Sequence, residues 1–364
     1  MKNFGFGMMR LPMNGNEPDY EQVSAMVDKF FEHGFTYFDT AHPYIQGLSE
    51  VAVKRCLSSR YPRESYILTN KLTSSFFNTA EEIVPLFEEQ LNACGVEYFD
   101  YYLMHAMNAE RHEKYKRLGA YEIAQKLKEE GRIKHIGISF HDTAKVLEKM
   151  LSEEPCIEVV QLQLNYVDFD DESVEAGKCY DVCVKYGKPV IVMEPVKGGS
   201  LVNLPKDAME LLTAATKDSP AGYAIRYAAS FENVMMVLSG MSNIEQMEDN
   251  IGSMENFVPF GENDYATVEK ICEIFKSQKL IPCTSCHYCT DGCPQQIPIP
   301  EIFFAMNKKK QFDDDWYGEL YYERVTAERG KACDCIKCGA CESACPQHLK
   351  IRDLLVSCSE EFDK

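Results

Sequence analysis

The chain has 364 residues, 45% hydrophobic and 26% charged, an ordinary composition for a globular protein with one large domain and a small one. Its formal net charge of -19 argues against nucleic acid or an anionic membrane surface as the main partner, because both would be repelled. The N-terminus lacks an apolar signal region and no stretch is apolar enough to span a membrane, so we expect a cytoplasmic protein.

The first 240 residues alternate between short apolar runs and longer amphipathic segments. The runs predict strands at Phe4–Met8, Thr36–Thr40, Tyr66–Lys71, Tyr98–His105, His135–Ser139, Val159–Gln163, Pro189–Glu194 and Met235–Ser239. Apolar residues at helical spacing predict helices at Tyr20–His33, Thr79–Cys94, Lys116–Glu130, Thr143–Ser152 and Glu172–Tyr186. Four glycines stand where helix C-caps are expected, namely Gly34, Gly95, Gly131 and Gly187.

Strands that alternate with helices favour βαβ units and a parallel sheet. Eight such units in about 250 residues favour a closed (β/α)₈ barrel over a doubly wound sheet. The doubly wound alternative also lacks its Gly-x-Gly-x-x-Gly signature after the first strand. A further helix, Asp264–Gln278, leads into the tail. We therefore predict an α/β protein with a barrel over residues 1–278 and a small, mainly helical domain over residues 279–364.

Cysteine usage sets the tail apart. Ten of the sixteen cysteines lie between residues 283 and 358. Eight of them form two matched runs, Cys283-x₂-Cys286-x₂-Cys289-x₃-Cys293-Pro294 and Cys335-x₂-Cys338-x₂-Cys341-x₃-Cys345-Pro346. This spacing holds [4Fe–4S] clusters in bacterial ferredoxins, where the fourth cysteine of each run ligates the other cluster.

The crossed pattern predicts two [4Fe–4S] clusters with defined ligand sets. One set is Cys283, Cys286, Cys289 and Cys345, and the other is Cys335, Cys338, Cys341 and Cys293. Zinc is the rival, since paired cysteines also bind it, but eight cysteines in two matched Cys-Pro runs favour iron–sulfur. Cys333 can replace Cys335 as a ligand, though the register favours Cys335, and Cys358 is expected to be an ordinary thiol.

The 41 residues between Cys293 and Cys335 are long for a compact ferredoxin, and Pro300–Lys310 and Tyr317–Arg329 within them predict helices. This segment resembles the helical two-cluster ferredoxin module in the iron–sulfur subunits of succinate dehydrogenase-type enzymes. The resemblance covers about 80 residues and implies a helical, ferredoxin-like fold.

Polar residues follow the barrel strands at the end where active sites lie. Asp39 ends the second strand, Tyr44 lies in the loop after it, and Lys71 and His105 end the third and fourth strands. In this arrangement Lys71 would lower the pKa of the tyrosine and Asp39 would keep the lysine charged. Tyr44 would then act as general acid toward a carbonyl oxygen, with a neutral His105 orienting the substrate.

Each of these residues alone has a structural explanation, such as a turn cap or a core histidine, but the set of four favours catalysis. The motif Phe38-Asp39-Thr40-Ala41-x-x-Tyr44, with Ser49-Glu50 after it, resembles the first signature of the aldo-keto reductases. The segments 68–72, 101–105 and 5–12 resemble the lysine strand, the histidine strand and the opening hairpin of that family. The resemblance spans about residues 1–255.

The resemblance implies a nicotinamide cofactor across the barrel mouth. Ser139 and Gln161 match positions that bind the carboxamide, and Met193 stands where a stacking tyrosine is usual. Gly198 and Gly199 suit a loop passing over the pyrophosphate. At the adenine end the matching residues are Gly240, Ser242, Gln246 and Asn250. No basic residue accompanies them for a 2′-phosphate, so NAD or mixed use of NAD and NADP is favoured.

The sequence thus predicts an NAD(P)-dependent oxidoreductase that reduces a carbonyl or oxidises an alcohol. Its two clusters would serve auxiliary electron transfer, with a ferredoxin or flavoprotein as redox partner, or would be structural. The alternative is an iron–sulfur electron-transfer protein whose barrel is a binding module without reductase activity. Phe140 and Met193, which depart from the family pattern, keep this alternative open.

Overall fold

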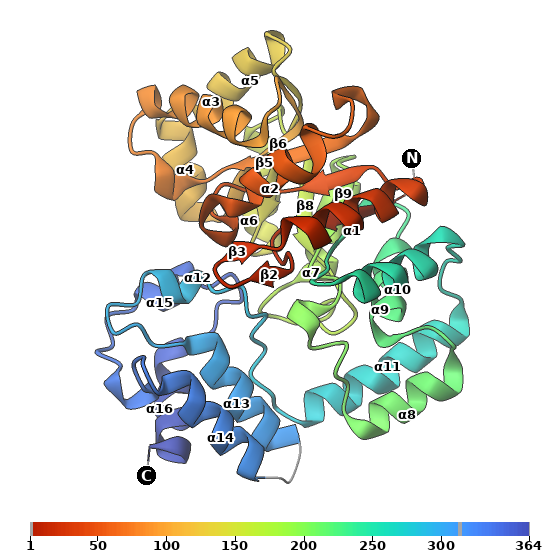
Figure 1. Ribbon diagram of the computed structural model, residues 1–364, viewed down its shortest axis with the longest axis vertical. Helices are drawn as coiled ribbons and strands as arrows, with labels where there is room; N and C mark the ends of the chain where they lie inside the picture. The colour runs from red at the N-terminus through yellow and green to blue at the C-terminus, as the bar shows by residue number, and fades with distance from the viewer. Residues whose placement is uncertain (1–2, 312–314, 364) are drawn as a thin grey trace. The chain divides into compact units, whose positions relative to one another are not determined.

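A computed structural model describes residues 3–311 and 315–363 (Figure 1). The chain forms two compact units, which are described separately. The first comprises Met1–Val196 and Ala221–Phe260, and the second comprises Lys197–Pro220 and Gly261–Lys364. The second unit therefore takes in residues 197–220 and 261–278 together with the cysteine-rich tail.

The first unit is built on a closed barrel of parallel strands in the order β1-β10-β9-β8-β7-β6-β5-β4. The strands are β1 (Phe4–Gly7), β4 (Tyr37–Asp39), β5 (Ile67–Leu72), β6 (Phe99–Met107), β7 (Ile133–Phe140), β8 (Val159–Gln163), β9 (Val190–Met193) and β10 (Val234–Gly240). All eight predicted strands are confirmed. A hairpin of β2 (Met13–Asn14) and β3 (Glu17–Pro18) follows β1.

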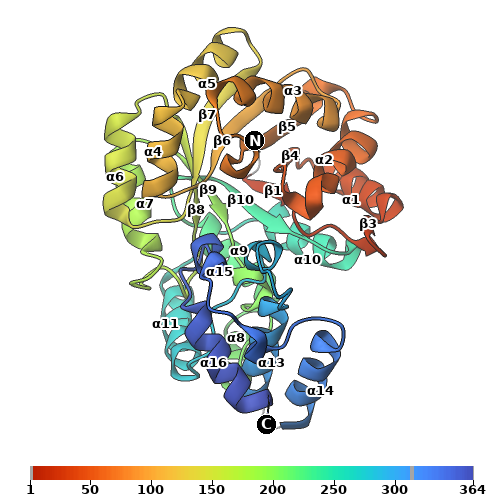
Figure 2. The same cartoon turned by 90° about the vertical axis from the view of Figure 1, so that its left-hand side faces the viewer.

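Helices lie outside the strands of the barrel (Figure 2). They are α1 (Tyr20–Glu32), α2 (Leu48–Ala52), α3 (Ile83–Cys94), α4 (Ala109–Arg117), α5 (Ala120–Glu129), α6 (Ala144–Glu153), α7 (Ala176–Lys185), α9 (Pro220–Ala229) and α10 (Ile244–Glu255). The four predicted C-cap glycines all have positive φ, which a glycine adopts without the steric penalty of a side chain.

The helix predicted over 116–130 corresponds to α5, but its predicted first turn is wrong. The chain forms two helices there, because α4 ends at Arg117 and α5 begins at Ala120. Gly119 between them has φ of 62°, a left-handed conformation that cannot continue a right-handed helix. The spacing of apolar residues does not reveal this break, because buried residues recur at helical spacing in both helices.

The barrel interior is filled by alternate residues of each strand, because successive side chains of a strand point to opposite faces. Tyr37, Leu103, Val159, Ile191 and Met236 pack together in this core. Gly137 on β7 makes room for two of them: a Cβ there would lie 2.5 Å from the Val159 side chain and 2.7 Å from that of Leu103. Only glycine therefore fits this interior position without repacking.

The second unit is helical in its described part. Its helices are α8 (Lys206–Ala215), α11 (Glu262–Ser277), α12 (Tyr288–Asp291), α13 (Ile299–Gln311), α14 (Asp315–Thr326), α15 (Ala340–Ala344) and α16 (Ile351–Phe362). The helices predicted at 264–278, 300–310 and 317–329 correspond to α11, α13 and α14. Ile302, Phe303 and Leu355 are buried in its core beside cysteines of both runs. None of the helices in the described ranges is long and apolar enough to cross a membrane.

Candidate functional site

The strand ends of the barrel bring one polar layer together. Five polar residues follow the inward-facing core residues of their strands at an even spacing, so their side chains also point into the barrel. They lie toward the C-terminal ends of the strands and are Asp39, Lys71, His105, Ser139 and Gln161. Two-residue periodicity therefore carries them to one end of the barrel, where active sites of this architecture lie. Each of the five is at most 5% exposed.

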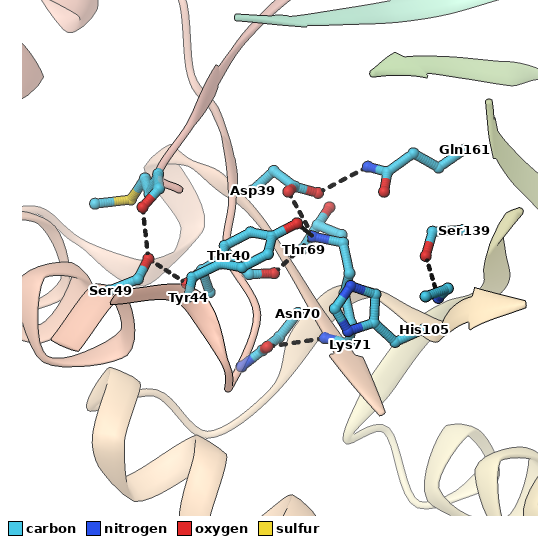
Figure 3. A network of polar contacts seen from close by, with 12 residues as sticks. Asp39, Thr40, Tyr44, Ser49, Thr69, Asn70, Lys71, His105, Ser139 and Gln161 are labelled. Carbon is cyan, nitrogen blue, oxygen red and sulfur yellow. Dashed lines mark hydrogen bonds and ion pairs between the residues drawn. The ribbon is translucent and has the colours of Figure 1, made fainter. Parts of the chain in front are cut away.

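Lys71 is the centre of this layer (Figure 3). Its Nζ lies 2.5 Å from Asp39 Oδ1 and donates hydrogen bonds to Thr40 O at 2.8 Å and to Tyr44 Oη at 3.1 Å. Tyr44 reaches it from a short helical turn after β4, and the ammonium also lies 4.7 Å from the centroid of the tyrosine ring. The structure thus brings together three of the four predicted catalytic residues through direct contacts.

Burial and pairing oppose each other at this ion pair. Burial raises the pKa of Asp39 and lowers the pKa of Lys71, and in each residue the opposite charge of the partner counters that shift. Asp39 Oδ2 also accepts a hydrogen bond from Gln161 Nε2 at 3.0 Å. The 2.5 Å Lys71–Asp39 contact and the hydrogen bonds to Thr40 and Gln161 favour the charged pair, because they offset the desolvation that burial imposes on each charge.

His105 completes the set, with its ring 6.0 Å from that of Tyr44 between centroids. Burial lowers its pKa well below the usual range, and the charges of Lys71, His141 and Arg111 lower that pKa further. Its Nδ1 lies 2.6 Å from Thr73 Oγ1. If that hydroxyl donates, the neutral ring carries its hydrogen on Nε2 and can donate it to a ligand.

A bulge in β6 aims His105. The register of β6 with β7 shifts between Met104 and Met107, and Ala106 has φ of 51°, which is strained for a residue with a side chain. The Ala106 N–H donates to Ser139 Oγ at 2.8 Å. The bulge has no signal in the sequence, because the residues on both sides of the histidine are apolar like those of a regular buried strand.

A buried network behind Lys71 was not foreseen from the sequence. Glu50 Oε1 accepts hydrogen bonds from Asn70 Nδ2 at 2.8 Å and from Gln90 Nε2 at 3.2 Å. Asn70 Oδ1 in turn accepts the Lys71 backbone N–H at 2.8 Å, and Gln90 also donates to Lys71 O at 3.0 Å. The network therefore fixes the strand that presents the lysine. Glu50 belongs to the signature motif, which was the available clue.

The predicted carboxamide-binding residues are placed at the same strand ends. Ser139 Oγ accepts a hydrogen bond from the Ala106 N–H, and Gln161 Nε2 donates one to Asp39. The Ser139 hydroxyl hydrogen and Gln161 Oε1 are therefore left for a ligand. Met193 ends β9 and is partly buried. The three residues belong to the neighbouring strands β7, β8 and β9.

A second cluster forms after β10. Ser242 Oγ donates to Arg10 O at 2.9 Å, and its N–H donates to Gln246 Oε1 at 2.8 Å. Asn250 Nδ2 donates to Ser239 Oγ at 2.9 Å, while its buried Oδ1 has no hydrogen-bond partner among the described residues. The Arg10 side chain covers Gly240, where a Cβ would lie 3.2 Å from it. Sequence reasoning missed this arginine, since it lies far away in the chain, before β2.

The cysteine runs of the second unit gather in two groups. Cys293, Cys335, Cys338 and Cys341 line one hollow together with Ile297 and Leu355. Burial raises the pKa of Cys289, and the charges of Cys286, Cys283 and Cys345 raise it further, so these three thiols lie in the neighbourhood of Cys289. In each group, the first three cysteines of one run lie with the fourth cysteine of the other run.

The two runs also share one backbone path. Ser285 and Lys337, the residues before each second cysteine, both have left-handed backbones, with φ of 51° and 59°. His287 and Gly339, the residues after it, repeat this with φ of 64° and 83°. Left-handed residues curl each loop, and the Ser285 N–H donates to Cys283 Sγ at 3.4 Å. Soft thiol groups in fours, with amides aimed at sulfur, fit an iron–sulfur cluster.

Gly198 and Gly199, predicted to pass over a pyrophosphate, lie in the second unit. Gly198 has φ of +61°, and a Cβ there would lie 2.2 Å from Thr284 O. The loop after β9 is thus packed directly against the first cysteine run, between Cys283 and Cys286. Gly199, with φ of +93°, has open space where its Cβ would be.

Comparison with protein families gives two matches. Residues 3–273 match the model of the aldo/keto reductase family, and residues 282–349 match that of a 4Fe-4S dicluster domain. The two ranges end and begin on either side of residue 278. Among curated proteins, an aldo-keto reductase of Mycobacterium avium is 28% identical over 236 residues, covering 64% of this chain and 75% of that protein.

Solved structures show the same barrel. An aldo-keto reductase from Klebsiella pneumoniae in complex with NADPH superposes with a TM-score of 0.61 at 18% identity, over 74% of this chain and 90% of that one. The holo form of an aldo-keto reductase from Bacillus halodurans gives a TM-score of 0.59 at 24% identity, over 74% and 91%. At these identities the likeness establishes the fold.

Proposed function

Since this chain belongs to the aldo/keto reductase family, we propose that it reduces a carbonyl compound, or oxidises the corresponding alcohol, with NAD or NADP. The observation that carries the proposal is the contact of Lys71 Nζ with Tyr44 Oη at 3.1 Å, inside a buried ion pair with Asp39. A phenol beside a lysine ammonium at the mouth of a barrel is suited to proton transfer.

Each residue of the site has its own role in the proposed carbonyl reduction. A reduced nicotinamide, when bound, supplies the hydride for the carbonyl carbon. Tyr44 Oη gives its proton to the carbonyl oxygen, and the Lys71 ammonium stabilises the phenolate that is left. Neutral His105 donates a hydrogen bond from Nε2 to the same oxygen and orients the substrate. In alcohol oxidation the phenolate takes the proton back.

The cofactor fits the polar groups left over at the barrel mouth. Ser139 and Gln161 would hold the carboxamide and Met193 would pack on the ring. The unpartnered Asn250 Oδ1 is a buried acceptor for an amino group such as that of adenine. Gly240, Ser242 and Gln246 would line the path between them.

Arg10 refines the cofactor proposal. The aliphatic part of its side chain lies over Gly240, and its guanidinium Nη2 lies 3.8 Å from Glu194 Oε1, so it supplies a cation that was not predicted at this end. We assign it to the cofactor phosphates, which favour an arginine fork. We retain the preference for NAD or mixed use, because Glu194 shares this cation and would repel an added 2′-phosphate.

For the tail, we propose two [4Fe–4S] clusters on the crossed ligand sets predicted from the sequence. A [4Fe–4S] cluster exchanges single electrons, whereas carbonyl reduction needs only a hydride and a proton. The clusters would therefore serve an auxiliary path to a ferredoxin or flavoprotein, or a structural role. The assembled Asp39–Lys71–Tyr44 site favours the reductase over a barrel that only binds.

The test is anaerobic purification followed by a panel of carbonyls and alcohols with both nicotinamides. Tyr44→Phe removes only the hydroxyl, and we expect carbonyl reduction to fall by a factor of ~10²–10⁴, the usual contribution of a general acid. Iron content should not change. Tyr186→Phe, at the end of α7, is the matched control and should keep full activity. Unchanged turnover in Tyr44→Phe would refute the proposed chemistry.

A further inference from the structure

Arg111 lies next to the proposed reacting site without a role in it. It stands in the first turn of α4, and its Nη1 donates a hydrogen bond back to the carbonyl oxygen of Ala106. Ala106 directly follows His105 in the bulge of β6. The guanidinium is thereby held beside the end of the strand that presents the histidine, on the loop side of the barrel.

In the part of the chain that the structure describes, this cation has no acidic partner. Across residues 3–311 and 315–363, the Arg111 side chain makes no ion pair, whereas Arg60, Arg63, Arg132 and Arg352 each bind a carboxylate. Asp142, the acid that caps the start of α4, uses its two oxygens for the backbone N–H groups of Ala109 and Thr143. Among the described residues, four of the five guanidinium N–H donors of Arg111 thus have no hydrogen-bond acceptor.

The position is electrostatically unfavourable in the free protein. A cation in the first turn of a helix opposes the helix dipole, whose positive end lies there. Lys71 and His141 also lower the pKa of His105 by their charge, and Lys71 is paired with Asp39. A partly buried arginine in such a setting gains most from an anion that arrives with the ligand.

We propose that Arg111 binds a carboxylate of the substrate, so that the preferred substrates are oxo acids rather than neutral aldehydes or ketones. This inference rests on the reductase function proposed above. The planar guanidinium suits a carboxylate, which accepts two parallel hydrogen bonds from it. A purely structural role, as a strut for the bulge, needs only the single bond to Ala106 and would affect every substrate alike.

The test compares two aldehydes of equal length, succinic semialdehyde and butanal, which differ in the terminal carboxylate. For the full-length holoenzyme we expect a higher kcat/KM with the semialdehyde. Arg111→Gln should lower that preference by at least ~10-fold, through KM, because a hydrogen bond to a charged group is lost. The value of kcat/KM for butanal should stay within about twofold. Arg117→Gln, at the exposed end of the same helix, should change neither.

Binding of succinate, measured by calorimetry, makes the test independent of turnover. We expect at least ~10-fold weaker binding to Arg111→Gln than to the wild type or to Arg117→Gln. If both aldehydes are inert but succinate binds through Arg111, the anion site stands and the reductase function falls. If turnover is normal and Arg111→Gln alters neither the substrate preference nor succinate binding, the inference is overturned and the reductase stands.

Discussion

The barrel mouth and the cysteine-rich segment reach functional geometry by different routes. At the mouth, residues as far apart in the chain as Asp39 and Gln161 meet because alternate side chains of every strand point into the barrel. In the tail, three of the proposed ligands of each cluster lie within seven residues, and left-handed residues between them curl the chain. Long-range topology specifies the first site, and local backbone conformation specifies the second. The two sites should therefore fail under different substitutions.

The largest effect is expected from removing one cluster ligand. Cys335→Ser should cost the protein about half of its iron, because one of two clusters loses a thiolate while the other keeps its set. Cys333→Ser is the control only two residues away, and Cys333 is exposed and outside the lined hollow. We expect no loss of iron from it. Iron and sulfide analysis of anaerobically purified protein measures both, and equal losses would contradict the assigned register.

A smaller effect is expected where the loop after β9 meets the first cysteine run. Gly198→Ala and Gly187→Ala both place a side chain at a left-handed position, with φ of +61° and +63°, and both should lose about 1 kcal/mol for that. Only Gly198→Ala also drives a methyl group against Thr284 O. Its extra loss should appear as reduced iron loading and a lower unfolding temperature. Identical behaviour of the two variants would show that the contact does not matter.

The smallest effect is expected from His42. Its Nδ1 lies 2.8 Å from Glu50 Oε2, and this hydrogen bond raises the pKa of His42. A raised folded-state pKa adds stability that is complete below the unfolded pKa of about 6.5 and is lost as pH rises through the higher folded value. The stability difference between wild type and His42→Gln should thus be larger at pH 5 than at pH 9. Chemical denaturation at both pH values measures it, and a reversed trend would contradict the pairing.

Much of the barrel was predictable because its signals are periodic and local. The eight strands, the C-cap glycines and the order of Asp39, Lys71 and His105 follow from apolar runs and turn residues. The matched cysteine spacing likewise predicts two crossed ligand sets, and both these sets and the clusters on them stay predictions. These features depend on residues that lie close together in the chain or repeat at a fixed interval.

The features that could not be predicted depend on contacts between residues that have no regular spacing in the sequence. Arg10 meets Gly240 across the closing seam of the barrel, where β1 pairs with β10. Gln90 reaches Lys71 from α3, and Arg111 folds back onto Ala106 through a bulge that changes the register of β6. Each contact requires the final arrangement of strands before its partners can be named, so the sequence alone could not predict these contacts.

The packing of Gly198 against Thr284 also has consequences for truncation of the chain and for sequence change among its relatives. A fragment ending at the proposed boundary, residue 278, would keep Gly198 but lose the segment that covers it. The tail is accordingly a poor candidate for a detachable cassette. In descent, a larger residue at 198 would be acceptable only with a compensating shift at 284, so the two positions should vary together among relatives that share both segments.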